Sequence, residues 1–175
     1  MTFAGLLPAA LAGVGLTLLG GACASDLRTR RIPNTVVVAI TLLGIAFSIA
    51  TRPWFSGVTN ALGGIAVGLT LWLPFYAWRM VGAGDVKLFA ACAAWLGPSG
   101  AVEAAVLTAL AGGLVALVAM TIDRGVSATL FRLVHAVREP AMLRAGPVSR
   151  FRRMPYALAI SGGVIAAAWL PGILW

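Results

Sequence analysis

Six apolar runs, separated by short segments that hold most of the charge, constrain the fold of this 175-residue chain more than any other feature. The runs lie near residues 3–24, 35–50, 58–78, 86–97, 100–122 and 155–175. About 20 apolar residues cross a hydrocarbon core as one helix, and the mean hydropathy of +0.98 is typical of membrane proteins. The first run lacks the basic start of a signal peptide, so we expect it to be retained. We therefore predict an all-α, polytopic integral membrane protein with six transmembrane helices in one membrane-embedded domain, residues 1–175.

The fourth run, 86–97, is short, because its dozen residues cover only about 18 Å as a helix. Charge placement nevertheless favours a crossing. With six spans and the N-terminus outside, Arg52 lies on the outer side and the other twelve of the 13 basic residues face inward. If 86–97 did not cross, the segment 123–153 with its seven arginines would face outward, against the positive-inside rule. We predict that both termini lie outside.

The segment 123–153 is the largest piece of chain outside the predicted spans. Apolar residues recur in it at helical spacing: Val126, Leu130, Val134 and Val137. This spacing fits a basic amphipathic helix on the inner membrane surface, and a loosely ordered basic loop is the alternative. The net charge of +8 therefore indicates contact with anionic lipid head groups rather than with nucleic acid.

The cysteines and the histidine do not form a metal-binding pattern. Cys23 and Cys92 lie in apolar runs without CxxC spacing, and His135 lies in the basic segment. We expect no zinc site, no disulfide and no cofactor.

Two of the five acidic residues are predicted at one membrane depth on separate helices. Asp26 follows the first run in ACASDLRTRRIPN, and Asp85 opens the fourth in RMVGAGDVK, both at the inner face. An acid at the bilayer edge is costly unless it is paired or functional. Two carboxylates a few ångströms apart do not both ionise easily, so they share a proton and hold a water between them. The ionised acid takes a proton from that water while the protonated acid polarises a carbonyl, which allows peptide hydrolysis without a metal.

Two glycines, Gly82 and Gly84, precede Asp85. Without a Cβ they allow a substrate backbone to approach, or positive φ just before the helix. Asp85 at a helix start also lies near the positive end of the helix dipole. The stretch is therefore suited to a substrate-binding turn.

Each aspartate also has a structural interpretation. Asp85 fits a helix N-cap, and Asp26 fits the polar end of the first span, paired with Arg28 or Arg30. The chain would then be a non-enzymatic membrane scaffold or a small proton or cation transporter. In that alternative, Asp26 and Asp85 pair with Arg30 or Lys87, or bind the ion.

Three motifs in order resemble those of the prepilin peptidases, the type IV leader peptidases, which are membrane aspartyl proteases. They are DLRTRRIPN after the first run, GAGDVKL at the fourth and MPYALAI at the last, and the resemblance covers essentially the whole chain. It implies that Asp26 and Asp85 form the catalytic pair. It also implies that a prepilin is the substrate, and that its short basic leader is cut after a glycine at the cytoplasmic face of the bacterial inner membrane.

The chain resembles the short branch of this family that serves Flp-type pilins of tight-adherence systems. Bifunctional members carry a further cytoplasmic segment after the first span, often with paired CxxC motifs, and N-methylate the new N-terminus. Here about ten residues separate the first two runs, so we expect an aspartic endopeptidase without N-methyltransferase activity. Presenilin-type proteases share the GxGD aspartate, but they carry a Tyr-Asp pair where Ser25 precedes Asp26 here.

Further residues are assigned to the site or to its surroundings. Lys87 either acts on the neighbouring aspartate and the substrate or is a topology charge. Pro155 and Tyr156 either line the site or begin the last helix. Asp123 is interpreted as a polar helix terminus, and Glu103 is placed near the outer face. The oligomeric state is not predicted.

Overall fold

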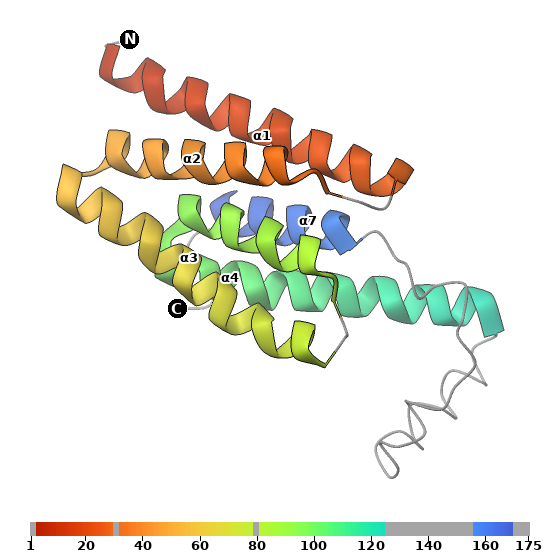
Figure 1. Ribbon diagram of the computed structural model, residues 1–175. Coiled ribbons are helices and arrows are strands. Elements are labelled where there is room, and N and C mark those ends of the chain that lie inside the picture. Colours follow the sequence, from red (N-terminus) through yellow and green to blue (C-terminus); the bar gives the residue numbers. More distant parts are fainter. Residues whose placement is uncertain (1–2, 30–31, 79–80, 125–155, 170–175) are drawn as a thin grey trace.

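The computed structural model describes residues 3–29, 32–78, 81–124 and 156–169, and all regular secondary structure within them is α-helical (Figure 1). The helices are α1 (Phe3–Thr29), α2 (Asn34–Thr51), α3 (Trp54–Ala77), α4 (Ala83–Arg124) and α7 (Tyr156–Trp169). The all-α prediction is confirmed.

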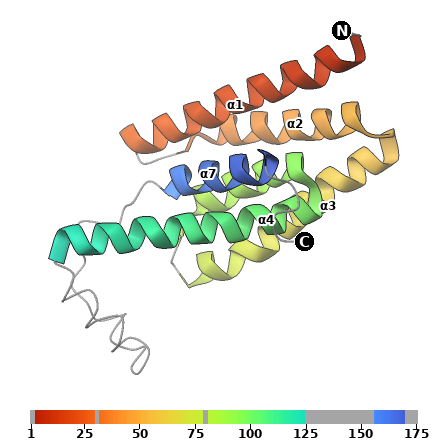
Figure 2. The ribbon, with the colours of Figure 1, turned by 180° about the vertical axis from the view of Figure 1, so that it is seen from behind.

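Short connections order the first helices into an antiparallel series. The end of α1, the start of α2 and the start of α4 therefore lie at one end of the bundle, and the two views of the ribbon agree on this (Figures 1 and 2). Asp26 and Asp85 belong to these segments, so we call this the aspartate end. Helix α7 also starts here, because the carbonyl of Ala157 in its first turn contacts Cys23 of α1.

Helix α4 is a helical hairpin, with two arms that run in opposite directions (Figure 1). The arms, 83–96 and 98–124, meet at Gly97, whose φ of 77° and ψ of −176° are essentially open to glycine alone. Pro98 follows, and because it has no N–H it cannot continue the helix through this point. The predicted runs 86–97 and 100–122 correspond to these arms.

The turn of the hairpin is held by close approach to α3, which is in turn hydrogen-bonded to α2. A Cβ at Gly97 would collide with the side-chain amide of Asn60, and one at Gly64 would collide with the backbone carbonyl of Ala93. The Asn60 Nδ2 atom donates to Ser48 Oγ at 3.2 Å. Contacts this close leave no room for side chains, so these glycines set the distance between α3 and the first arm.

Trp95 attaches the first arm to α1 and α2. Its indole packs directly against Gly15 of α1 and Gly44 of α2. A Cβ added at Gly15 would lie 2.5 Å from a ring atom, and one added at Gly44 would lie 2.6 Å from a ring atom. The Nε1–H group donates to the carbonyl of Ile40 at 3.0 Å, and the ring centroid lies 5.2 Å from that of Phe47. The arm that carries Asp85 in its first turn is thus fixed at its far end by a half-buried tryptophan.

The described helices have the lengths of membrane spans. Four of them are long and apolar enough to cross a bilayer: α1 over Leu7–Thr29, α2, α3, and α4 over Ala83–Leu114. The apolar stretch of α7, Ala157–Trp169, is shorter. The protein is therefore a membrane protein, whereas the count of six spans and the position of the termini stay predictions.

Exposed aromatic side chains at both ends of α3 agree with a membrane span. Trp54 and Phe55 are exposed at its start, and Tyr76 and Trp78 are exposed at its end. Aromatic residues gather at both membrane–water interfaces, because one part of each ring system is apolar and the other is polar.

One helix boundary differs from the prediction. The first run was predicted to end at residue 24, but α1 continues to Thr29, because backbone hydrogen bonds need no apolar side chains. The Thr29 hydroxyl even donates to the Ser25 carbonyl at 2.9 Å. Asp26 therefore lies inside α1, one turn before its end, and its interpretation as the polar end of the first span stays a prediction.

Two predictions fall on other parts of the chain. The amphipathic segment 123–153 lies outside the described residues, except for Asp123 and Arg124 at the end of α4. Pro155 also lies outside them. The last predicted run, 155–175, is described over Tyr156–Trp169.

Candidate active site

Asp26 is a buried acid, with 9% of its surface exposed. Its Oδ2 atom accepts no hydrogen bond from the described residues. Arg28, one of its two predicted structural partners, is exposed on the same helix, and Arg30 lies outside the described part of the chain. A buried acid with an unpartnered oxygen is costly, so burial of this residue requires an explanation other than packing.

Asp85 is half-buried in the first turn of α4. Its Oδ2 atom accepts a hydrogen bond from the Gly82 N–H at 3.1 Å, and its own N–H donates to the Gly82 carbonyl at 3.1 Å. The bond to the Asp85 side chain is one half of a capping box, and the second bond joins backbone groups, because Gly82 has no side chain. The interpretation of Asp85 as the N-cap is thus wrong, because its side chain reaches back to Gly82 from inside the helix.

The structure brings the two predicted aspartates together at the aspartate end. The charge of Asp26 acts on Asp85 across the two helices. Ile32, in the connection after α1, covers the start of α4, since a Cβ at Gly84 would lie 3.7 Å from its side chain. The chain segments that follow Asp26 and precede Asp85 are therefore packed against each other.

The two glycines before Asp85 have different surroundings. A Cβ at Gly82 would lie 3.1 Å from Asp85 Oδ2, which is tighter than ordinary contact. A Cβ at Gly84 would make ordinary contact with Ile32. Neither glycine has positive φ; among the described glycines Gly97 alone does. A side chain at Gly82 would thus crowd the Asp85 carboxylate, and the expected positive φ is absent at both glycines. The approach of a substrate backbone to these glycines stays a prediction.

The structure also gives the positions of two other predicted site residues, Lys87 and Tyr156. Lys87 is exposed on the first arm of α4. The backbone of Tyr156 begins α7, directly before Ala157, whose carbonyl oxygen lies 3.6 Å from Cys23 Sγ. The start of α7 is therefore within one turn of the helix position of Asp26. Sequence reasoning missed this contact, because nothing in the chain marks Cys23 as a partner of a helix more than 130 residues away.

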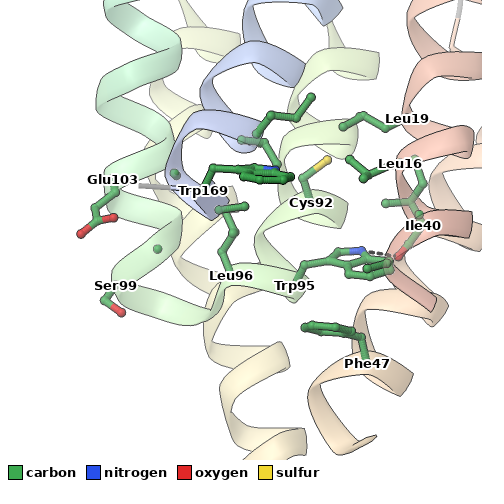
Figure 3. Close-up of a pocket in the computed structure, with 17 residues that line it drawn as sticks. Leu16, Leu19, Ile40, Phe47, Cys92, Trp95, Leu96, Ser99, Glu103 and Trp169 are labelled. Atoms are coloured by element: carbon green, nitrogen blue, oxygen red, sulfur yellow. Dashed lines mark hydrogen bonds between the residues drawn. The ribbon is translucent and has the colours of Figure 1, made fainter. Parts of the chain in front are cut away.

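An apolar cavity of about 590 Å³ lies between α1, α2, both arms of α4 and α7 (Figure 3). Its lining includes Leu19, Cys92, Trp95 and Glu103. Neither aspartate lines it, so it is not the candidate active site. Glu103 is buried, with 4% of its surface exposed, which the sequence did not predict.

The fold and the site together define a class of protein: a helical membrane protein in which two acids from separate helices interact at one end of the bundle. Residues 13–117 match the type IV leader peptidase family, and this region includes both aspartates. The chain belongs to this family.

Three curated relatives are prepilin leader peptidase/N-methyltransferases. The protein of Pectobacterium carotovorum subsp. carotovorum is 30% identical over 100 residues, which cover 53% of this chain and 35% of the relative. The protein of Dickeya chrysanthemi is 34% identical over 99 residues (47% and 34%), and that of Burkholderia pseudomallei is 32% identical over 121 residues (63% and 38%). The chain thus spans little more than a third of the length of these relatives. No solved structure matches it significantly.

Proposed function

We propose that this protein is a membrane aspartic endopeptidase that removes the short leader from Flp-type prepilins. The observation that supports this most is that Asp26 and Asp85 lie at the same end of the bundle, where the charge of Asp26 acts on Asp85. These two acids come from separate helices in a chain of the type IV leader peptidase family. The names of the relatives indicate a prepilin as the substrate class.

In the proposed reaction the two carboxyl groups share one proton and hold a water molecule. The ionised carboxylate takes a proton from the water as its oxygen attacks the carbonyl carbon of the scissile bond. The protonated carboxyl donates a hydrogen bond to the carbonyl oxygen and stabilises the negative charge that develops there. The C–N bond then breaks as the leaving amine receives a proton from the carboxyl that took it.

We place the aspartate end at the cytoplasmic face of the bacterial inner membrane, with six spans and both termini outside. Exposed Arg28 and Lys87 lie in the segments that form this end, whereas Arg52 lies at the other end of α2. This arrangement follows the positive-inside rule and brings basic side chains to anionic head groups. Gly82 and Gly84, with Pro155 and Tyr156 at the start of the last helix, are proposed to shape the space for the substrate backbone.

We propose peptidase activity without N-methylation. Only residues 30–33 separate α1 from α2, so this connection does not hold the further segment that the bifunctional relatives are expected to carry. A mass measurement of the processed pilin tests this, because a methyl group on its new N-terminus would contradict the proposal.

The proposed function is tested by co-expressing the protein with a Flp-type prepilin from the same source and measuring the mass of the pilin. We expect a leader-sized mass loss with the wild type and none with the double variant Asp26→Asn/Asp85→Asn, at equal membrane levels. An intact pilin in the presence of folded wild type, or equal trimming by both, would contradict the proposal. Ion binding that needs both aspartates, without cleavage, would favour the transporter or scaffold alternative.

A methyl group at position 82 is expected to disturb the site without unfolding the protein. In Gly82→Ala the new Cβ would lie 3.1 Å from Asp85 Oδ2, so the carboxylate has to shift, and we expect kcat to fall about tenfold. The control is Gly21→Ala, because a Cβ at that helical glycine meets nothing within 4 Å. Cleavage kinetics on a synthetic prepilin measure both, and equal kcat values would show that the Asp85 carboxylate tolerates the shift.

A further inference from the structure

A polar contact joins α1 to α7 one turn before Asp26. The Cys23 Sγ atom lies 2.8 Å from Ser161 Oγ and 3.6 Å from the carbonyl oxygen of Ala157. Both side chains are buried, with 8% of Cys23 and 7% of Ser161 exposed. The contact therefore lies inside the helix interface, where water does not compete for its hydrogen bonds.

Two donor assignments fit this contact. If the Ser161 hydroxyl donates to the Ala157 carbonyl at 2.7 Å, the Cys23 thiol donates to Ser161 Oγ. If the Ser161 hydroxyl instead donates to Cys23 Sγ, the thiol donates to the Ala157 carbonyl. In both assignments the thiol S–H is a donor from α1 to α7.

The two aspartates are held in different ways. The Asp85 carboxylate has its own backbone donor, the Gly82 N–H. The Asp26 Oδ2 atom accepts no hydrogen bond within the described part of the chain. The orientation of Asp26 therefore depends on how α1 is rotated and how deep it lies. Residues three apart share a helix face, so a bond at Cys23 constrains the rotation and the depth of α1 at Asp26 as well.

We propose that Cys23 and Ser161 are positioning residues that hold the Asp26 carboxylate toward Asp85. The proposal rests on the proposed peptidase function. Helix α1 packs chiefly on α2 and less on α7, and the Cys23 thiol makes a polar link to α7 through Ser161 and the Ala157 carbonyl. Loss of this link removes one constraint on the rotation of α1 relative to α7, which lowers the rate of the chemical step without altering substrate binding.

The test compares Cys23→Ala, Cys23→Ser and the wild type in cleavage of a synthetic Flp-type prepilin by purified full-length protein. Cys23→Ala removes the donor, and we expect kcat to fall about tenfold while KM stays unchanged. Cys23→Ser restores a donor, and we expect kcat within about twofold of the wild type. Cys92→Ala is the matched control, because Cys92 is also a buried cysteine of the helix bundle but lies on the first arm of α4; we expect its kcat to be unchanged.

Several results would overturn the proposal. They are a wild-type kcat in Cys23→Ala, an equal fall in Cys23→Ser, and an equal fall in Cys92→Ala. The variant Asp26→Asn is measured in the same series: cleavage that survives it refutes the proposed function itself. Wild-type kcat in Cys23→Ala beside an inactive Asp26→Asn refutes only the positioning role.

A second measurement applies if Cys23→Ala fails to accumulate in the membrane. The variant Ser161→Cys, made together with Cys92→Ala, places a second thiol opposite Cys23. We expect an oxidant to form a disulfide that blocks labelling by a maleimide, with a change in kcat that a reductant reverses. Absence of the disulfide, or a disulfide that leaves kcat unchanged, would overturn the proposal.

Discussion

Asparagine at either position 26 or position 85 is expected to lower the kcat of leader cleavage by at least about a thousandfold, because in the proposed mechanism the two aspartates act as one catalytic unit and cannot replace one another. Asparagine has nearly the shape of aspartate but neither accepts the proton of the attacking water nor holds a transferable one. For the same reason the double variant is expected to be no slower than either single variant. Steady-state cleavage of a synthetic prepilin by purified protein measures all three.

The matched control for these variants is Glu103→Gln. Glu103 is a buried acid like Asp26, but it lines the apolar cavity, to which neither aspartate contributes. We expect Glu103→Gln to cleave at nearly the wild-type rate. If it is as inactive as the aspartate variants at equal membrane levels, loss of any buried acid inactivates the protein, and the Asp26–Asp85 assignment is not supported.

Gly97→Ala is expected to destabilise the protein by about 2 to 4 kcal/mol. Two costs combine at this residue. The φ of 77° with ψ of −176° is strained for any residue with a Cβ, and the new Cβ would collide with the Asn60 side chain. The hairpin of α4 has to open or Asn60 has to leave Ser48. The midpoint of SDS-induced unfolding in mixed micelles, followed by tryptophan fluorescence, measures the loss.

The control for this prediction is Gly113→Ala, in the second arm of the same hairpin. A Cβ there meets nothing within 4 Å, and alanine is the better helix former by about 1 kcal/mol. We expect its unfolding midpoint to equal or exceed that of the wild type. An unchanged midpoint in Gly97→Ala would mean that the two arms do not depend on a glycine at their junction.

The sequence predicts a helix well where the apolar run begins and ends close to the helix itself. The runs 35–50 and 58–78 correspond to α2 (Asn34–Thr51) and α3 (Trp54–Ala77). The Gly97–Pro98 pair separates two apolar runs at the observed turn. The prediction fails at the end of α1, because hydropathy drops at Ser25 and Asp26 while the backbone hydrogen bonds continue to Thr29.

Contacts between helices lie beyond sequence reasoning. Shared membrane depth predicts that Asp26 and Asp85 are near each other, but the sequence does not give their separation. The capping bond of Asp85 depends on the local path of the backbone at Gly82. The Cys23–Ser161 contact joins residues that are 138 positions apart, and neither residue type marks it in advance.

The short first arm of α4 has a consequence for the surrounding lipid. Its 14 residues, 83–96, are about 21 Å long as a helix, about 9 Å less than a typical hydrocarbon core. In the proposed six-span arrangement this hydrophobic mismatch is relieved when the bilayer thins around the arm or when one end of the arm lies below the lipid surface. Either response shortens the path between the aqueous phase and Asp85. The proposed hydrolysis needs water at a bond near the membrane boundary, and the short length of this arm brings that bond closer to the aqueous phase.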